Sequence, residues 1–519
     1  MIRRLTAIAV ALCLLLCCAV ASADSIYPME GKSLTVLTTV DSDLALFGFS
    51  SYADTPGFQQ WQKATGVDVA ITEVVDTNAL LLQLAGGDLP DIVRCGKNFY
   101  PKGFAAMVDE GVATVLTDKL PEYAPNYWAF LNSSENIYNS AALAMDGSLE
   151  IISFAGNFYP ETSPFRNYGG ILVRKDFMDK LGMDAIVTLD DFTTYLRRCK
   201  EELGVSTPLM SQDYQARYVW QTGLITSPFG LVSAGAYQVD GVYHYGAYEP
   251  EFKDVLSYLH DLYTEGLMDP NFAVTDANTA IAAMTSGDSC AIRGMTSYFQ
   301  NIKNAANNDE MQLTAIPALV AKEGDVPFMS FATTITSNSF WCFVTDECKD
   351  VETALRFMDY LYTPEGMDLA NYGIEGETFE YDADGNPKFT EFVTNNPDGY
   401  AVDPIMRSYG LINWSCIHRQ AFSEQRFPLP EQREACNIWA ASDYNKYMIS
   451  YSSVPADLQE ENTRLWTDLE TYMNEHVANI ITGADSLDTF DDYIAGMKAL
   501  GMDRYIEIQQ LAIDPYYKD

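Results

Sequence analysis

The sequence lacks the short motifs that most often carry enzyme chemistry. It contains no Gly-x-Ser-x-Gly elbow of a serine hydrolase, no Gly-x-Gly-x-x-Gly turn of a dinucleotide-binding fold and no phosphate-binding Walker loop. It also contains no Cys-x-x-Cys, and its four histidines are not paired at the spacings of helical or zinc-finger metal sites. We therefore expect no catalytic residue, no metal site and no cofactor.

Basic residues are scarce in comparison with acidic ones. The 519 residues include 32 Lys and Arg but 72 Asp and Glu, which gives a formal net charge of −40. Such a surface repels phosphate backbones and anionic lipid headgroups, so the composition argues against nucleic-acid and membrane-surface partners. A hydrophobic share of 48% supplies ample material for a core and excludes a disordered chain.

Long apolar runs are absent except at the start of the chain. Arg3 and Arg4 precede an apolar stretch from Leu5 to Val20, and Ala21-Ser22-Ala23 supplies a small-x-small cleavage pattern. We expect an export signal that is cleaved after Ala23, and hence an extracellular or cell-envelope location. No later run approaches the ~20 apolar residues that a membrane span needs.

Cysteine is sparse beyond this signal. Three of the ten cysteines lie inside it, which leaves an odd number, seven, in the remaining 496 residues. A disulfide framework is therefore not expected, although a bond between Cys342 and Cys348 stays open. A lipidated cysteine normally follows a small residue, whereas Leu16 precedes Cys17, so a lipid anchor is the less favoured alternative.

Hydrophobic residues recur with the periods of both strands and helices, which is typical of an α/β protein. Strand-like runs at 33–38, 67–71 and 91–93 alternate with helical stretches that end at glycines. This β-α-β-α-β order predicts a parallel sheet with loops gathered at the strand ends. Thr188 begins a capping-box pattern, and turns at Asp240-Gly241 and Asp384-Gly385 predict hairpins. The exported length predicts two or three domains at about 150 residues each.

The turn near Asp384 also has the oxygen spacing of the start of a calcium-binding loop, with Asp382 as the first ligand. Pro387 stands where such a loop needs glycine, and its last ligand position falls on Val393, which offers no oxygen. We expect a plain hairpin turn, with calcium binding as the alternative.

Aromatic residues are plentiful, with 7 Trp, 32 Tyr and 26 Phe. Oligosaccharides present apolar C–H faces between hydroxyl edges, and aromatic rings combined with polar side chains form the matching surface. Most such rings nevertheless belong to protein cores. The many carboxylates leave a glycosidase acid pair open, so a secreted glycoside hydrolase is an alternative function.

Five segments resemble one protein family, in family order along the chain. Gly86-Gly87-Asp88-Leu89-Pro90-Asp91-Ile92 matches the small-Gly-Asp-x-Pro-Asp-aliphatic signature of the family 1 extracellular solute-binding proteins of ABC importers. Two further matches are Gly170-Ile171-Leu172-Val173-Arg174-Lys175-Asp176-Phe177 and residues 263–270. The last two are Tyr360-Leu361-Tyr362-Thr363-Pro364-Glu365-Gly366 and Asn371-Tyr372-Gly373-Ile374-Glu375-Gly376. The resemblance covers nearly the whole exported chain and is to the large oligosaccharide-binding branch.

The resemblance implies an α/β fold of the periplasmic-binding-protein type 2 architecture, with two lobes, hinge crossings and a ligand cleft between the lobes. Lobe one would take residues 24–155 and 330–400, and lobe two residues 156–329 and 401–519. The implied function is non-catalytic capture of an oligosaccharide by a monomer, followed by delivery to the permease subunits of an ABC transporter. The same fold with a peptide or another polar solute is a further alternative.

Candidate ligand-binding residues follow from expected positions on loops at strand ends or near the crossings, where the family cleft lies. They are Tyr52, Asn98, Arg166, Tyr168, Trp220, Arg293, Tyr298, Glu375 and Trp414. Each also has an ordinary structural interpretation: core packing for Trp220, a contact between lobes for Trp414, a surface ion pair for Arg293 and a helix cap for Glu375.

Overall fold

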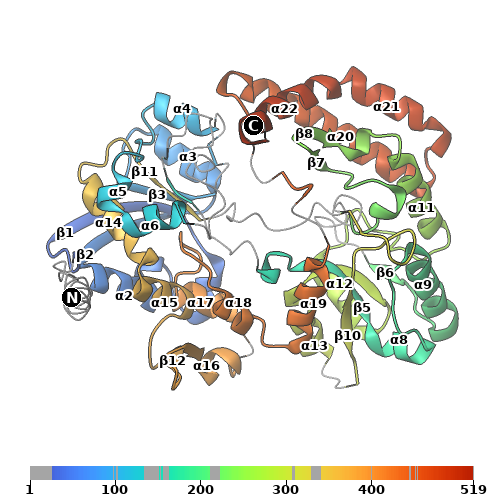
Figure 1. The fold of residues 1–519 in the computed structure, drawn as a ribbon, viewed down its shortest axis with the longest axis horizontal. Coiled ribbons are helices and arrows are strands. Elements are labelled where there is room, and N and C mark those ends of the chain that lie inside the picture. The colour runs from blue at the N-terminus through green and yellow to red at the C-terminus, as the bar shows by residue number, and fades with distance from the viewer. Residues whose placement is uncertain are drawn as a thin grey trace, which may run out of the picture.

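The computed structural model describes residues 26–96, 99–100, 103–133, 151, 153–155, 163–210, 223–306, 310–328, 340–398, 400–442, 446–449, 452 and 454–517. Within these ranges the chain forms two α/β bodies, each built around its own sheet (Figure 1). The expected export signal lies outside the described residues.

The first lobe is built on a five-stranded sheet of order β2-β1-β3-β11-β4. Its strands, in that order, are Val67–Val74, Lys32–Thr39, Ile92–Cys95, Trp341–Val344 and Ser153–Phe154. β1 is parallel to β2 and β3, as the β-α-β-α-β pattern predicts, whereas β11 is antiparallel to β3 and β4. The predicted parallel pairing is therefore confirmed for the three strands of the opening unit. β11 joins the sheet in the opposite direction, because it follows β10 (Leu313–Ile316) of the other lobe in the chain and not a crossover helix.

The second lobe contains a four-stranded sheet of order β10-β5-β9-β6. These strands are Leu313–Ile316, Gly169–Arg174, Ala291–Met295 and Leu209–Met210. β5 is antiparallel to both neighbours, and β6 is parallel to β9. All six residues of β5 are buried, because helices cover both faces of the sheet.

Helices complete both lobes, and their caps explain where they begin and end. The Thr55 side chain caps α2 (Pro56–Thr65), whose first residue is proline, and Gly66 ends it at φ 70°. The capping box predicted at Thr188 is confirmed at the start of α9 (Leu189–Leu203). The predicted hairpins are confirmed as β7 (Ala236–Val239) with β8 (Val242–Tyr245), and β12 (Phe379–Tyr381) with β13 (Pro387–Phe389).

The remaining helices divide between the two lobes. In the first lobe they are α3 (Thr77–Ala85), α4 (Gly103–Asp109), α5 (Leu120–Tyr123), α6 (Pro125–Leu131), α14 (Val351–Asp359), α15 (Pro364–Tyr372), α16 (Glu391–Thr394), α17 (Val402–Ser408) and α18 (Gln420–Arg426). In the second lobe they are α8 (Lys175–Leu181), α11 (Phe252–Thr264), α12 (Ala277–Ser286), α13 (Thr296–Ala306), α19 (Pro430–Ala440), α20 (Gln459–Thr482), α21 (Phe490–Ala499) and α22 (Met502–Tyr517). Short 3-10 turns include η1 (Ser42–Phe47), η2 (Tyr52–Asp54) and η3 (Pro164–Arg166).

Each lobe has its own hydrophobic core. One core joins residues between Leu34 and Ala155 to residues between Trp341 and Cys416. Two others serve the second lobe, one on each face of its sheet, and one of these extends to Ile513 near the end of the chain. At the crossing between the lobes, the rings of Phe165 and Phe427 pack 5.6 Å apart beside Cys436.

The segment from Val402 to Phe422 packs with the first lobe. Leu411, Trp414 and Cys416 are buried in the same core as β1, and α17 contacts α2 and η1. The family resemblance implies that residues 401–519 belong to the second lobe. We propose instead that the first lobe extends to about Arg426 and that the final crossing follows it, because a core must be contiguous in space and not in sequence.

Candidate functional site

A polar cavity of about 320 Å³ lies at the carboxyl ends of β1 and β3. Parallel strands end at the same edge of a sheet, so the residues that follow each strand meet there. The cavity is lined by Thr39, Val40, Asp41, Ser42, Tyr52, Arg94, Cys95, Gly96, Phe340 and Arg407. We call it the strand-end cavity.

Arg94 is the buried centre of this cavity wall. Its side chain is 3% exposed, and it donates from Nε to the carbonyl of Asn413 at 2.8 Å and from Nη1 to Thr38 Oγ1 at 2.8 Å. Its guanidinium carbon lies 5.0 Å, 4.9 Å and 5.0 Å from the ring centres of Tyr52, Phe340 and Trp414. Through these cation–π contacts, the three rings surround the guanidinium.

Asp41 connects several residues in and around the strand-end cavity through hydrogen bonds and an ion pair. Its Oδ2 accepts from the Tyr52 hydroxyl at 3.1 Å and from Asn413 Nδ2 at 3.0 Å, and it lies 3.4 Å from Arg407 Nη1. Burial by itself would raise the pKa of Asp41, but the charge of Arg407 and these hydrogen bonds lower it below its usual value. Burial and the Asp41 charge raise the pKa of Tyr52, so its hydroxyl remains a neutral donor.

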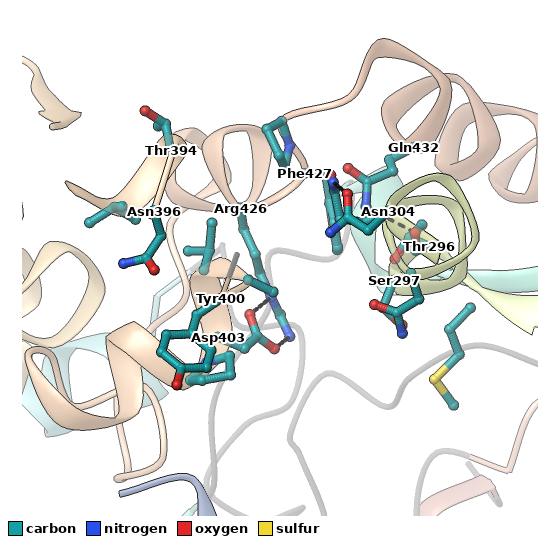
Figure 2. Close-up of a pocket in the computed structure, with 18 of the residues that line it drawn as sticks. Thr296, Ser297, Asn304, Thr394, Asn396, Tyr400, Asp403, Arg426, Phe427 and Gln432 are labelled. Atoms are coloured by element: carbon teal, nitrogen blue, oxygen red, sulfur yellow. Dashed lines mark hydrogen bonds and ion pairs between the residues drawn. The ribbon is translucent and has the colours of Figure 1, made fainter. Parts of the chain in front are cut away.

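A larger cavity of about 540 Å³ lies between the two lobes. One wall comes from residues 393–396 and 400–404 of the first lobe, the other from α13, and residues 426–428 and 432 join them (Figure 2). We call it the interlobe cavity. Tyr168, just before β5, and Met295, the last residue of β9, also line it, so it reaches the ends of the two central strands of the second sheet.

One ion pair stands in the interlobe cavity. Arg426 Nε donates to Asp403 Oδ1 at 2.6 Å, and Arg426 Nη2 donates to Oδ2 of the same carboxylate, so the contact is bidentate (Figure 2). Burial opposes ionisation of Asp403, yet the Arg426 charge outweighs it and lowers the Asp403 pKa. This carboxylate therefore stays ionised and paired.

Neutral polar groups make up most of the rest of the interlobe cavity. Amides come from both walls: Gln300, Asn301, Asn304, Asn395, Asn396 and Gln432. Gln432 Nε2 donates to the Thr296 carbonyl at 2.9 Å, and Gln300 Nε2 donates to Asn304 Oδ1 at 2.6 Å. Tyr168, Tyr400 and Phe427 add aromatic rings. Rings together with paired donors and acceptors are suited to a polar solute that has apolar faces.

The predicted ligand-binding residues divide among several places. Tyr52 lines the strand-end cavity, and Tyr168 lines the interlobe cavity. Trp414 is 0% exposed and packs beneath the strand-end cavity against Tyr52, with ring centres 5.6 Å apart. Glu375 is exposed beside the β12–β13 hairpin and is brought to neither cavity.

Arg293 and Tyr298 are buried in the second lobe. Arg293 lies within β9, paired with Ile171 of β5, and not in the turn expected after the strand. Gly170 and Gly294 face each other across β5 and β9, and a Cβ on either would meet the ring of Trp439 or Tyr298. The two glycines thus create a recess that these rings fill, so Tyr298 is a core residue.

Three predicted residues are not placed. Asn98 and Trp220 lie outside the described residues, and only the backbone of Arg166 is described, at the end of η3. Their assignment to the ligand cleft stays a prediction.

Sequence reasoning missed several cavity residues. Phe340 has φ 66°, a left-handed conformation that is uncommon for a residue with a side chain and that clusters at functional sites. Arg407 and the amides of α13 lie far in sequence from the strand ends used for the prediction. The run Asn395-Asn396 was a local signal, but it reads from sequence as a simple turn.

The described residues contain no cluster of three or more His, Cys, Asp or Glu side chains able to hold a metal ion. Near Asp384, Asp382 Oδ1 accepts from the backbone N–H groups of Asp384 and Asn386 at 3.0 Å and 2.9 Å, so it serves as the turn's own acceptor. The seven cysteines after residue 23, all of them within the described part of the chain, are buried and form no disulfide, and these include Cys342 and Cys348. Every helix in the described part of the chain is too short or too polar to cross a bilayer.

With this geometry established, comparison with known proteins identifies the family. The sequence model of the bacterial extracellular solute-binding protein family matches residues 49–368, and the chain belongs to this family. The resemblance found in the sequence is therefore confirmed. Family members are binding proteins of the cell exterior.

Two curated relatives come from Bacillus subtilis. Lipoprotein LipO is 24% identical over 367 residues, which are 66% of this chain and 66% of LipO. The polygalacturonan/rhamnogalacturonan-binding protein YtcQ is 24% identical over 329 residues, or 61% of each chain. The chain thus matches just under two thirds of the length of these relatives.

Solved structures establish the fold over almost the whole length. The alginate-binding protein AlgQ2 without calcium ion has a TM-score of 0.73 at 18% identity, covering 94% of this chain and 98% of AlgQ2. An HMO-binding, ABC-transporter-associated solute-binding protein from Bifidobacterium longum infantis has a TM-score of 0.72 at 16% identity, covering 94% of this chain and 100% of that protein. FusA of S. pneumoniae, in complex with kestose, has a TM-score of 0.70 at 18% identity, covering 93% and 99%. The expected two-lobe solute-binding fold is confirmed.

Proposed function

We propose that this protein captures an oligosaccharide between its two lobes and delivers it to the permease of an ABC importer. The observation that carries the proposal is the interlobe cavity, whose walls come from both lobes of a solute-binding fold. A solute held by both walls binds the closed arrangement better than the open one, so it shifts the population toward closure. The permease would recognise that closed shape.

The cavity chemistry supports an oligosaccharide as the solute. Amide side chains both donate and accept hydrogen bonds, as sugar hydroxyls do, and the nearby rings of Tyr168 and Tyr400 suit the apolar faces of sugar rings. Several relatives are named for polysaccharide or oligosaccharide binding. These names describe the relatives, and their agreement with the cavity chemistry supports the same class of solute here.

We further propose binding without turnover. A glycoside hydrolase needs two carboxyl groups about 5–9.5 Å apart, one of them protonated to act as an acid. The carboxylates lining the two cavities within the described chain are Asp41 and Asp403, and each has a lowered pKa and an arginine partner. Neither carboxyl group therefore holds a proton that it could donate as a general acid. This supports a carrier over the alternative of a secreted hydrolase.

The proposed export route follows the sequence pattern. Residues 1–23 would direct export and be removed after Ala23, and the released chain would act as a monomer outside the cytoplasmic membrane.

A thermal-shift screen against monosaccharides and oligosaccharides tests the proposal, because a ligand that binds only the folded state raises Tm. Calorimetry on each hit should give one solute per chain, and chromatography of the recovered glycan should show it unchanged. Newly formed reducing ends would instead identify a hydrolase.

A matched pair of variants locates the site. Tyr168→Ala removes a ring from the interlobe cavity and should weaken binding about tenfold. Tyr381→Ala removes a 45% exposed ring of β12 that lines neither cavity and should leave affinity unchanged. Equal effects of the two substitutions would place the solute elsewhere.

A further inference from the structure

The two cavities are electrically balanced, and this points to the charge of the solute. In the strand-end cavity, Arg407 Nη1 lies 3.4 Å from Asp41 Oδ2 and 3.3 Å from Asp43 Oδ2. In the interlobe cavity, Arg426 is held by Asp403 through two parallel hydrogen bonds. Both of these arginines are therefore already paired with carboxylates of the protein.

The N–H groups of Arg94 are taken up by neutral acceptors and not by a carboxylate. Its Nε and Nη2 donate to the Asn413 carbonyl and its Nη1 donates to Thr38 Oγ1, while three aromatic rings surround the guanidinium. Because only 3% of Arg94 is exposed, little of its guanidinium is accessible to a solute. Its charge is compensated at a distance by Asp41, which shares Tyr52 and Asn413 with it.

A sugar that carries a carboxylate would need a cation or N–H donors that are not already paired within the protein. Moving an ionised carboxylate out of water is strongly unfavourable unless a cation or several N–H donors replace its hydration. Binding a uronate here would require it to compete with Asp41, Asp43 or Asp403 for their arginines. The net charge of −40 also repels anions at long range.

We infer that the solute is an uncharged oligosaccharide and that acidic, uronate-containing chains are excluded. The inference rests on the proposed function and narrows its substrate class. It separates this protein from relatives named for alginate and polygalacturonan, both of which are polyanions. The amide-lined interlobe cavity supplies neutral donors and acceptors without adding a cation.

The test begins with calorimetry on two panels of equal chain length. The neutral panel contains gluco-, manno-, galacto-, xylo- and fructo-oligosaccharides, and the acidic panel contains oligogalacturonides and alginate oligomers. The best neutral ligand is then oxidised at its primary alcohols to carboxylates, which changes its charge and little else. We expect binders only in the neutral panel, and at least about a tenfold loss of affinity on oxidation.

Tight binding of an acidic oligomer, or no loss on oxidation, would overturn the inference and leave the proposed capture function standing. Failure of every glycan in both panels to bind would overturn the proposed function together with the inference.

Two charge variants test the stated cause. Asp43→Asn leaves Arg407 with a single carboxylate partner and should reduce the penalty for the oxidised ligand several-fold. Asp68→Asn makes the same change in net charge on the exposed side of β2, near the opposite end of the sheet, and should leave that penalty unchanged. An equal effect of both variants would show that overall charge, and not local pairing, sets the selectivity, and would overturn the inference.

Discussion

At the scale of single residues, the strand-end cavity is organised by an aromatic group around one buried arginine. Arg94 is surrounded by Tyr52, Phe340 and Trp414 at nearly equal distances, but the three rings differ in exposure. Tyr52 and Trp414 are buried, whereas Phe340 is half-buried and lines the cavity. The ring available to a solute is therefore Phe340, with Arg94 holding its other side.

Phe340→Ala should weaken solute binding about tenfold, or about 1.4 kcal/mol, because it removes the exposed ring while leaving the buried pair in place. Calorimetry with the ligand found in the screen measures the change. Phe229→Ala serves as the matched control, since Phe229 is half-buried beside a separate groove of the second lobe. Unchanged affinity in Phe340→Ala would remove this ring from the binding site.

His418 gives the protein a predictable response to acid. Burial, followed by the nearby Arg426 charge, lowers its pKa from 6.5 to about 3. The unfolded chain binds a proton at His418 near pH 6.5 and the folded chain does not. The contribution of neutral His418 to the free energy of unfolding is therefore fully present above pH 6.5, and it is lost progressively as the pH falls toward 3.

We expect the free energy of unfolding, measured in urea, to fall less steeply in His418→Gln than in the parent between neutral pH and about pH 5. Ser423→Ala, a buried neighbour without a titrating group, is the control and should shift stability by the same amount at every pH. Parallel pH curves for the parent and His418→Gln would refute the assignment.

At the scale of elements, the second sheet is shaped by the missing side chains of two glycines. Gly170 on β5 and Gly294 on β9 stand opposite each other and admit the rings of Trp439 and Tyr298. Trp439 Nε1 donates to the Ile316 carbonyl at 3.1 Å, so α19 is attached to the edge strand β10 as well as seated on the sheet. Because α19 follows the final crossing, this packing fixes where the crossing joins the second lobe.

Gly170→Ala should destabilise the protein by about 1–3 kcal/mol, since the new Cβ would overlap the indole nitrogen of Trp439. Urea unfolding measures the loss. Adding Trp439→Phe to Gly170→Ala should cost less than the sum of the two single substitutions, because the smaller ring relieves the clash. Strict additivity would show that the recess is not what constrains position 170.

At the scale of the whole molecule, two separate cores make relative motion of the lobes the natural response to a solute. Most buried side chains belong to one lobe or the other, while Phe165, Phe427 and Cys436 form a small cluster at the crossing. A small junction between large cores bends more readily than the cores deform. The interlobe cavity lies beside this junction, with Phe427 in its lining.

Small-angle scattering should therefore show a smaller radius of gyration when the solute found in the screen is added. A sugar that causes no thermal shift is the control and should leave the radius unchanged. An identical radius with and without the bound solute would contradict capture by closure.

Much of the architecture follows from local pattern, because hydrophobic period and capping chemistry act over a few residues. The opening β-α-β-α-β unit, the Thr188 capping box and both hairpins could be predicted, as could the family from motifs such as 86–92. Tyr52 and Tyr168, which are predicted to bind the ligand because one follows and the other precedes a strand, each line a cavity, and their contact with a solute stays a prediction.

The rest depended on contacts between distant parts of the chain. Whether Trp414 and Tyr298 face a solute or a core was decided by burial, which arises only when residues hundreds of positions apart pack together. The antiparallel β11, the return of residues 402–422 to the first lobe and the pairing of Arg407 and Arg426 with carboxylates were likewise decided by these distant contacts. Sequence alone determined the elements and the family, since these depend on near neighbours. Tertiary structure decided the lining and charge of the cavities, since both depend on which side chains the fold brings face to face.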